Sequence, residues 1–495
     1  MIDNRCSQTT LLIFKPSNFD VTRFVRACSG LFSPFPLTVR LVIPSTAMNL
    51  YRRYVFLSLY LFLWMPASSQ PAEERRPNIV FMFADDLGTG DLGCYGHPYA
   101  VTPNIDRLAA EGTRFTRHYA TGVTCCPSRT GFMTSHHPAS FDAYMADFGF
   151  GDRITITELL NNEGYATGHF GKWHIGADSD GVPEDHYGLD EVKIIGNSDG
   201  SDGRDDGLFA AAIDFIKRHE DEPFYVNIWG HITHYPVPPS KRIPEAIAKL
   251  EIDESKFDSY MSDKFENTRE WGYSVDECFR NYLTDVYSLD LAVGRVLQLL
   301  DELELADNTI VVFSSDQGAA PNGDYQNDRQ RAMDKIFKAN MLGWSGGLRG
   351  GKHEKYEGGV RIPFIIRWPG HVPPSHVNGS SVLSGLDWLP TLCTLTDTGY
   401  DPAQFEGLNV ADIWLGGDRN PTRVLFWRAG GDAALLEPWK LHLTRKGPEL
   451  YNLSKDPRET TNVARSHSEI TQQLATEIEK WRKTLPAKVR RKGRS

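Results

Sequence analysis

The stretch Asn78-Ile79-Val80-Phe81-Met82-Phe83-Ala84-Asp85-Asp86 decides the fold class that we predict for this chain of 495 residues. Its apolar residues run without interruption, as is typical of a strand buried on both faces of a sheet. Further strand-like runs, separated by helical patterns, occur at 165–170, 224–229, 309–313 and 363–368. This alternation predicts an α/β fold with a large, mostly parallel sheet.

The first 70 residues are predicted to lie outside this fold. Arg52 and Arg53 precede the apolar run 54–64, and small residues follow at 66–70, which is the pattern of a secretory signal peptide. The run is shorter than the roughly 20 apolar residues of a membrane span, so we expect cleavage, with an uncleaved anchor as the alternative. Met48 stands where such a signal begins. We therefore assign 48–70 to the signal peptide and 1–47 to a non-native start or a dispensable extension.

Composition changes again after about residue 416. Short strand-like pieces at 423–427 and 440–443 precede a helical pattern at 468–484. We interpret 417–487 as a smaller C-terminal α+β domain that follows a large domain at 77–416. Residues 488–495 are strongly basic and are expected to form a solvated tail.

Charge and cysteine content exclude two classes of protein. The formal net charge of −11 argues against a nucleic-acid-binding protein, because neutralising phosphates requires a basic surface. Seven cysteines in a chain of this length do not make a disulfide framework. Past Gln70 the number is odd, so export would leave at least one cysteine unpaired or chemically altered. These five are Cys94, Cys125, Cys126, Cys278 and Cys393.

Polar side chains follow four of the predicted strands at the point where each strand ends. In open α/β sheets, ligands bind beyond the carboxyl ends of the strands, so these groups are expected to meet at one edge. Each group alone could be a capping or core residue, but four together favour a site. The groups are Asp85-Asp86, Lys172 with His174, His231 with His234, and Asp316-Gln317.

Four of these side chains offer only oxygen as a ligand, namely Asp85, Asp86, Asp316 and Gln317. Carboxylate and amide oxygens suit hard cations such as Ca²⁺ or Mg²⁺, whereas zinc prefers thiolate and imidazole. Several carboxylates at one edge would repel one another without a cation or basic residues beside them. The pattern therefore predicts a hard-cation site.

Cys125 precedes Pro127, a favoured first residue of a helix, and Arg129 follows. Cys125 would then lie at the positive end of a helix, where anions bind, and the guanidinium of Arg129 suits an oxyanion. A helix end also acidifies a thiol, so a plain thiolate nucleophile is an alternative. These residues favour a hydrolase of anionic esters and leave sulfate and phosphate both open.

The run Cys125-Cys126-Pro127-Ser128-Arg129 resembles the C-x-P-S-R signature of type I sulfatases, in which the first cysteine is oxidised to formylglycine. The resemblance covers nearly all of the chain after Pro77 and implies an alkaline phosphatase-like sheet sandwiched by helices. Further matching motifs are Asp91-Leu92-Gly93-Cys94-Tyr95-Gly96, Thr102-Pro103-Asn104-Ile105-Asp106-Arg107-Leu108, Gly171-Lys172-Trp173-His174, His231-Ile232-Thr233-His234-Tyr235-Pro236, Ser315-Asp316-Gln317-Gly318, Gly351-Lys352 and Glu449-Leu450-Tyr451-Asn452-Leu453.

The resemblance implies a role for each site residue. Cys125 would become formylglycine, whose hydrate attacks sulfur and also contacts the metal. Arg129 and Lys172 would stabilise its alkoxide, and His174 would remove the hydroxyl proton when the sulfated intermediate breaks down. His234 and Lys352 would grip the sulfate and protonate the leaving alcohol. One Ca²⁺ per chain would bind Asp85, Asp86, Asp316 and Gln317. Gln317 departs from the family, where asparagine or histidine is commoner, and we expect altered ligand geometry rather than loss of metal.

The family implies a secreted or periplasmic sulfuric ester hydrolase that acts on a sulfated polysaccharide or its oligosaccharides. Its other partner would be a formylglycine-generating or sulfatase-maturating enzyme, and we expect no membrane association once the signal is cleaved. The alternatives are a phosphodiesterase or phosphonate monoester hydrolase of the same superfamily, and an inactive calcium-dependent glycan-binding protein. The choice of sugar is expected to depend on the segments 178–207 and 319–344.

Overall fold

The computed structural model describes residues 75–176, 186–195, 203–323 and 332–487. The parts predicted at 1–47, 48–70 and 488–495 lie outside these ranges. Within the ranges, no helix combines the length and the apolar character that crossing a membrane would require. The five cysteines past Gln70 are all described, and none of them forms a disulfide.

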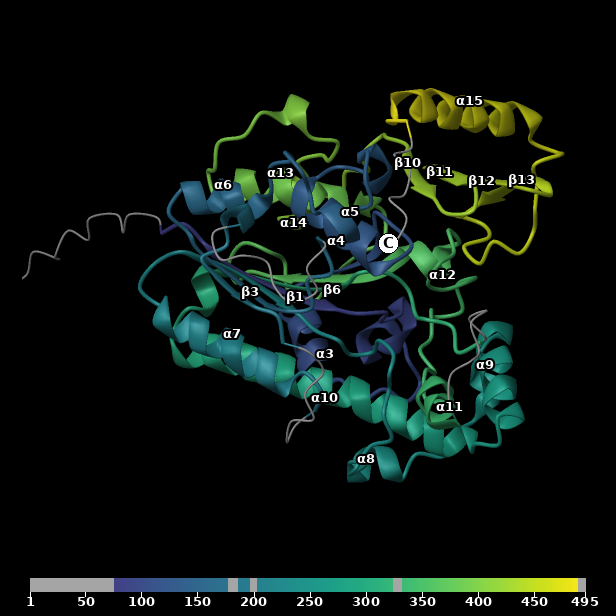
Figure 1. The fold of residues 1–495 in the computed structure, drawn as a ribbon, viewed down its shortest axis with the longest axis horizontal. Helices are drawn as coiled ribbons and strands as arrows, with labels where there is room; N and C mark the ends of the chain where they lie inside the picture. The colour runs from purple at the N-terminus through teal and green to yellow at the C-terminus, as the bar shows by residue number, and fades with distance from the viewer. Residues whose placement is uncertain (1–74, 177–185, 196–202, 324–331, 488–495) are drawn as a thin grey trace, which may run out of the picture. The chain divides into compact units, whose positions relative to one another are not determined.

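A mixed sheet is the centre of the fold, and strand β1 (Asn78–Ala84) lies inside it with every residue buried (Figure 1). The strand order is β4-β3-β5-β1-β6-β7-β2-β8, and the short β9 also pairs with β2. The first five strands of this order are parallel, whereas β7 runs antiparallel to both neighbours. The mostly parallel sheet is therefore confirmed. The other strands are β2 (Thr113–Tyr119), β3 (Ala166–Gly171), β4 (Glu191–Lys193), β5 (Phe224–Trp229), β6 (Thr309–Ser315), β7 (Arg361–Arg367), β8 (His376–Asn378) and β9 (Leu383–Ser384).

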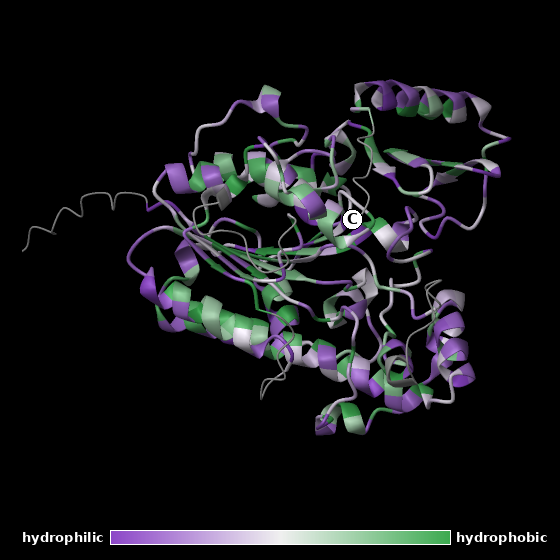
Figure 2. Ribbon diagram, viewed as in Figure 1, coloured by the Kyte–Doolittle hydropathy of each residue, from purple (hydrophilic) through white to green (hydrophobic). Residues whose placement is uncertain are grey.

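Helices cover both faces of the sheet, as Figure 1 shows. Side chains alternate across a strand, so Val80 and Met82 pack into one core and Phe81 and Phe83 into another. Figure 2 shows the apolar strands between the two layers. One layer contains α3 (Pro103–Ala110), α7 (Asp206–Arg218) and α10 (Val275–Glu302). The other contains α4 (Cys125–Thr134), α5 (Met145–Phe148), α6 (Ile156–Asn162), α13 (Trp388–Leu395) and α14 (Ala411–Trp414).

A separate antiparallel sheet follows near the C-terminus, in the order β10-β11-β12-β13. Helix α15 (Ser468–Thr484) confirms the predicted helix and packs on this sheet through Leu474 and Ile478. Its strands are β10 (Leu425–Arg428), β11 (Asp432–Leu436), β12 (Trp439–Thr444) and β13 (Gly447–Asn452). The strand pattern predicted β10 and β12 but neither β11 nor β13. The boundary between 416 and 417 stays a prediction.

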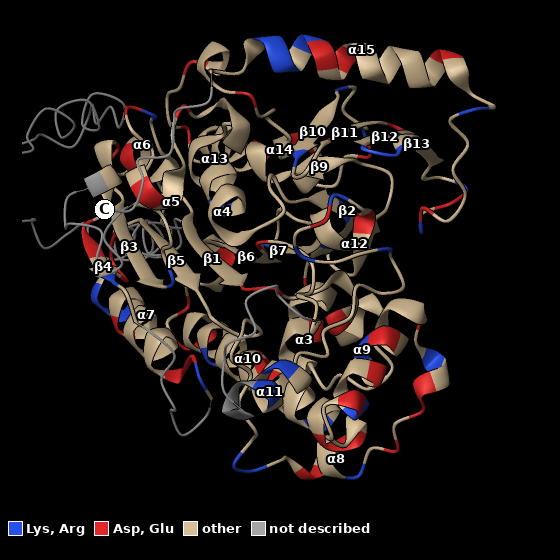
Figure 3. Cartoon of the chain, turned by 45° about the vertical axis from the view of Figure 1, so that its right-hand side comes forward, with Lys and Arg blue, Asp and Glu red and all other residues tan. Residues whose placement is uncertain are grey.

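Four further helices complete the described part of the chain. They are α8 (Glu245–Ala248), α9 (Ser259–Glu270), α11 (Ala332–Ala339) and α12 (Glu357–Val360). Lysine, arginine, aspartate and glutamate are mixed along α9 and α15 (Figure 3). Such mixed charge is typical of solvent-facing helix surfaces.

Candidate active site

Four parallel strands deliver the predicted polar groups to one edge of the sheet. Ala84 pairs with Ser315, and Trp229 pairs with both Phe83 and Gly171. Because these pairs are the last of each strand, the residues that follow leave the sheet together. They are Asp85-Asp86 after β1, Lys172 after β3, His231 to His234 after β5 and Asp316-Gln317 after β6.

Cys125 meets this edge from the first turn of α4. The helix begins at Cys125, two residues earlier than the position of Pro127 suggested. The Sγ atom lies 3.3 Å from Asp85 Oδ1, 3.3 Å from Gln317 Nε2 and 3.5 Å from Lys172 Nζ. Only 3% of the residue is exposed. The structure thus brings the signature cysteine into contact with the predicted metal ligands.

The acidic residues form a possible metal site. One ligand atom from each of Asp85, Asp86, Cys125 and Asp316 lies within 4.8 Å of the others. Gln317 Oε1 is buried and has no hydrogen-bond partner in the described part of the chain, while Gln317 Nε2 donates to Asp86 Oδ1. A buried amide oxygen without a partner costs free energy unless something binds it. A hard cation would satisfy this oxygen and the carboxylates, so the donor set fits Ca²⁺.

Three basic side chains surround the acids. Arg129 is fully buried and donates through Nε and Nη2 to Asp316 Oδ2 at 3.1 and 3.0 Å. Lys172 Nζ donates to Asp85 Oδ2, and Lys352 Nζ donates to Asp86 Oδ2 at 2.8 Å. Each predicted cation therefore faces at least one predicted carboxylate, and Arg129 also lies 3.4 Å from Asp85 Oδ2.

The mixed charges shift the pKa values of the buried groups. Burial opposes ionisation of Asp85, but the cations, Lys172 foremost, hold its pKa well below the ordinary value. Burial together with Asp85 raises the pKa of Asp316 to about 7. Burial, Asp316 and Asp85 raise the pKa of the Cys125 thiol, opposite to the lowered pKa that a helix N-terminus alone would give. Burial and the neighbouring carboxylates therefore disfavour negative charge on Asp316 and Cys125, and a bound cation would offset both effects.

Both predicted histidines line the same cavity as Cys125. His234 Nε2 lies 3.8 Å from Asp86 Oδ2, and its Nδ1 lies 2.6 Å from the carbonyl oxygen of Tyr235. Burial lowers the pKa of His234, which favours the neutral imidazole. His174 is exposed and adopts a positive φ of 61° directly after β3 and Lys172-Trp173. All predicted site residues are therefore gathered at one place.

The cavity has a volume of 440 Å³ and contains residues that the sequence reasoning did not single out. Two of them come from the segment 319–344, which was expected to influence the choice of sugar. Three others are direct neighbours in sequence of predicted site residues, and Tyr144 directly precedes α5. The additional residues are Thr124, Tyr144, Tyr235, Lys338, Met341 and His353.

A buried ion pair positions the loop that carries His234. Arg204 donates to Asp285 through Nε at 3.0 Å and Nη2 at 2.6 Å. Its Nη1 donates to the carbonyl oxygens of His234 at 3.1 Å and Pro236 at 2.7 Å. Asp205 accepts the backbone N–H of His231 at 2.8 Å. Sequence reasoning missed this ion pair, and Asp285 within the apolar pattern of α10 was the available signal.

Comparison with known proteins decides the family. Residues 77–398, more than half of the chain, match the protein family described as Sulfatase. The chain belongs to the sulfatase family. This sulfatase is 28% identical over 473 residues to arylsulfatase A of Homo sapiens, covering 79% of this chain and 84% of the relative. It is 27% identical over 515 residues to an N-acetylgalactosamine-6-O-sulfatase of Bacteroides thetaiotaomicron, covering 82% and 93%.

Solved structures share the fold of this sulfatase. A structure described with the metabolism of multiple glycosaminoglycans by Bacteroides thetaiotaomicron has a TM-score of 0.65 and 24% identity, covering 83% of this chain and 100% of that one. A protein in complex with its substrate D-glucosamine-2-N,6-O-disulfate has a TM-score of 0.63 and 21% identity, covering 83% and 98%. The resemblance to type I sulfatases of the alkaline phosphatase superfamily is confirmed, and the protein is an enzyme that hydrolyses sulfate esters.

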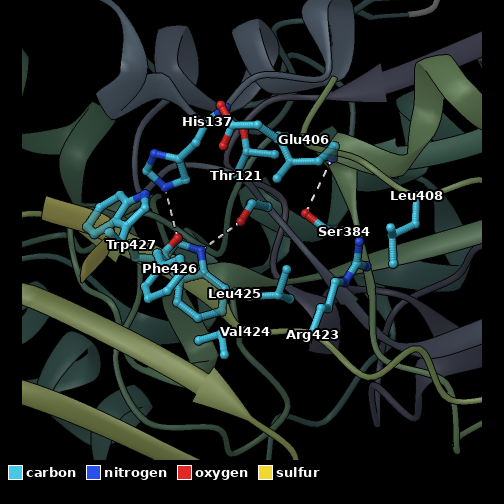
Figure 4. Close-up of a pocket in the computed structure, with 13 residues that line it drawn as sticks. Thr121, His137, Ser384, Glu406, Leu408, Arg423, Val424, Leu425, Phe426 and Trp427 are labelled. Carbon is cyan, nitrogen blue, oxygen red and sulfur yellow. Dashed lines mark hydrogen bonds between the residues drawn. The ribbon is translucent and has the colours of Figure 1, made fainter. Parts of the chain in front are cut away.

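A second cavity, of 160 Å³, is lined by different residues from the candidate active site and lies where β10 approaches the mixed sheet (Figure 4). Its polar side chains are engaged by neighbouring groups of this sulfatase. His137 Nε2 lies 2.9 Å from the carbonyl oxygen of Phe426, and Arg423 Nη2 donates to Asp387 Oδ2 at 2.5 Å. These contacts give the second cavity a structural role.

Proposed function

We propose that this sulfatase removes sulfate from a sulfated polysaccharide or its oligosaccharides with the help of calcium and a formylglycine at position 125. The observation that carries the proposal is the contact of Cys125 Sγ with Asp85, Gln317 and Lys172. The formylglycine would arise through a maturating enzyme that recognises the signature 125–129. Its hydrate would supply the attacking hydroxyl group.

Calcium would be held by Asp85, Asp86, Asp316 and Gln317, together with the modified residue 125. When bound, it would supply positive charge to a sulfate oxygen. Support comes from the oxygen-only donor set and from the unsatisfied Gln317 Oε1. If the proposal is correct, calorimetry of metal-free protein will detect one Ca²⁺ per chain, and the affinity will fall in Asp316→Asn. An equal affinity in the two proteins would contradict it.

The basic residues would offset the repulsion between an anionic nucleophile and an anionic ester in a site of reduced dielectric. Arg129 and Lys172 lie beside residue 125 and would stabilise its deprotonated oxygen. Lys352 and His234 face Asp86 from the cavity and would bind the sulfate and donate a proton to the leaving oxygen. His174, whose side chain is exposed, would accept a proton from the remaining hydroxyl group of residue 125 when the sulfated intermediate breaks down.

Two other activities remain as candidates for this metal site. A related phosphodiesterase or phosphonate monoester hydrolase would prefer a phosphorus ester, and an inactive glycan-binding protein would cleave neither ester. Comparing release of 4-nitrophenol from its sulfate and its phosphate separates the three. We expect preference for the sulfate, and preference for the phosphate or no release from either would overturn the proposal.

Mass spectrometry of the peptide that contains residue 125 tests the modification directly. Oxidation of the Cys125 thiol to an aldehyde replaces sulfur by oxygen and lowers the residue mass by about 18 Da, the balance of losing H₂S and gaining oxygen. The protein should be produced with a sulfatase-maturating enzyme. An unmodified thiol in protein that still turns over the aryl sulfate would refute the role of formylglycine.

We also propose that the protein is exported to the periplasm or the cell exterior after cleavage of the signal at 48–70. We propose separately that the chain divides into a large domain at 77–416 and a smaller one at 417–487. N-terminal sequencing of the secreted protein provides the test. A mature chain that retains the apolar run 54–64 would contradict cleavage.

A further inference from the structure

The wall of the active-site cavity contains residues that the proposed reaction does not use. Lys338 lies on α11 and Met341 follows that helix, and both line the cavity that also contains Cys125. Tyr144 and Tyr235 contribute to the same wall. The volume of 440 Å³ falls within the range of about 300–1,000 Å³ that is usual for small-molecule sites. There is therefore room for more of the substrate than the sulfate group.

Close ion pairs balance the acidic residues at the sheet edge beside the cavity. Lys352 faces Asp86 at 2.8 Å, and Arg129 faces Asp316 at 3.0 Å. Asp86 is the carboxylate that lines the cavity in the described part of the chain. Lys338 is half-buried and lines the same cavity, so its ammonium group can meet a bound ligand there. Neither the proposed metal site nor the scissile sulfate uses this residue.

The remaining wall residues suit a sugar ring. Tyr144, which is 50% exposed, and Tyr235 both line the cavity that contains Cys125, so aromatic side chains form part of its wall. A tyrosine combines an apolar ring with a polar hydroxyl group, which matches the alternation of C–H and O–H groups on a sugar. Met341 adds an adaptable apolar contact. An aromatic wall with one ammonium group fits a sugar that carries an anionic substituent.

We propose that Lys338 binds a second anionic group of the substrate, a carboxylate or a second sulfate, on the sugar that carries the scissile sulfate or on its neighbour. The inference rests on the proposed function and narrows the substrate class to saccharides with at least two anionic groups. A lysine suits this task because its ammonium group is a compact charge on a flexible stem and accepts either anion.

Binding to the full-length Cys125→Ala protein with Ca²⁺ tests the proposal without turnover. Three ligands are compared by calorimetry: N-acetylgalactosamine 6-sulfate, its 4,6-disulfate, and the disaccharide in which a hexuronate is linked to the 6-sulfated sugar. We expect at least one of the two ligands with a second anion to bind about tenfold more tightly than the monosulfate, as for one hydrogen bond to a charged group. The stronger of the two identifies the anion as sulfate or carboxylate.

Three variants at two positions of α11 assign this preference to one side chain. In Lys338→Met the advantage of the second anion should disappear, and in Lys338→Arg it should return. Lys335→Met is the matched control, because Lys335 lies on α11 but is exposed and does not line the cavity. It should keep the preference. Raising the NaCl concentration should narrow the gap in affinity between the ligands, since salt screens a partly exposed charge.

Equal affinity of the wild-type site for all three ligands would overturn the proposal, as would an unchanged preference in Lys338→Met or failure of every ligand to bind. Failure of the proposed function has a different signature. In that case the unsubstituted protein would release no sulfate from any ligand, while the binding preference and its loss in Lys338→Met would persist.

Discussion

Two adjacent cysteines of this sulfatase lie in different surroundings. Cys125 Sγ contacts an acid, an amide and an ammonium group at the sheet edge, whereas Cys126 is buried in the apolar core with Phe132 and Met133. The first turn of α4 turns the two side chains toward different neighbours, because successive residues of a helix point about 100° apart. The chemistry of the signature thus depends on one of the two sulfur atoms.

Cys125→Ala is expected to abolish turnover almost completely, because the methyl group cannot become the nucleophile. Cys126→Ala, its matched control, should remain active with a small loss of stability, since it removes one buried sulfur atom from the core. Initial rates with 4-nitrophenyl sulfate and thermal unfolding of both variants provide the measurement. Unchanged turnover in Cys125→Ala would refute the proposed mechanism.

Lys352→Ala is expected to raise the activation barrier by about 2.7–4 kcal/mol, the usual effect of removing one preorganised electrostatic contact. The ammonium group lies 2.8 Å from Asp86 Oδ2 and faces the cavity, so its loss removes charge where sulfate would bind. The measurement is kcat/KM for an aryl sulfate. Lys355→Ala is the control, since Lys355 Nζ donates to the carbonyl oxygen of Ala429 and lies outside the cavity. A similar loss in both variants would contradict the role of Lys352.

At the scale of elements, the loop after β5 is held from two sides. The N–H of Asp85 donates to the carbonyl oxygen of Ile232 at 3.0 Å, and the N–H of Thr233 donates back to Asp85 at 2.7 Å. The ion pair between Arg204 and Asp285 then connects the far side of the loop to α10. The loop that carries His234 therefore depends on two segments that are distant in sequence.

Arg204→Met is expected to displace His234 and to lower turnover about 100-fold, since misplacing a reacting group by about 1 Å has an effect of this size. The loss should be greater for a sugar sulfate than for 4-nitrophenyl sulfate, because the poorer leaving group depends more on proton donation by His234. His234→Ala should show the same dependence on the leaving group. Equal losses for both substrates, with a lowered midpoint of unfolding, would indicate a purely structural role for Arg204.

At the scale of the whole described fold, a buried charge cluster connects α12 to the C-terminal sheet. Lys440 Nζ lies 2.7 Å from Glu357 Oε1, and the N–H of Glu357 donates to Glu459 Oε2 at 2.6 Å. His442 Nε2 lies 2.7 Å from Glu459 Oε1. All four side chains are buried. Because α12 directly precedes β7, this cluster joins the C-terminal sheet to the mixed sheet that contains β7.

Stability is expected to depend on pH through Glu459, whose pKa burial raises from the ordinary 4.5 to about 7. The folded state then binds a proton more strongly than the unfolded state, so this group stabilises the fold at low pH and loses that effect as pH rises from about 4.5 to 7. Glu459→Gln keeps the shape and removes the titration. Its midpoint of thermal unfolding relative to the wild type should be higher at pH 8 than at pH 5. A difference that does not change with pH would contradict this assignment.

Local patterns were sufficient for much of the fold. The apolar runs predicted β1, β3, β5 and β6, and the helical pattern at 468–484 predicted α15, because burial of one face imposes a period along the chain. The polar residues at the strand ends were predicted to meet for a related reason: parallel strands end at the same edge. The signature 125–129 predicted that Cys125, rather than Cys126, is the reactive cysteine.

Other features were beyond the reach of local patterns. The antiparallel direction of β7 and the strand β11 depend on partners far along the chain. The polar sequence of Arg204 and Asp205 contains no sign that these residues hold the loop of His234. The segment 319–344 was suspected of influencing the choice of sugar, but nothing in it indicated that Lys338 would line the cavity.

Residue order alone specifies the kinds of chemical group available to this sulfatase and the strand ends that present them, because residue type and hydrophobic period are local properties. Packing of the folded chain brought each carboxylate to a cation, left Gln317 Oε1 without a protein partner among the described residues, and placed a lysine of α11 in the cavity wall. Distances between residues hundreds of positions apart are settled by packing of the whole chain, and the chemistry of the site depends on those distances.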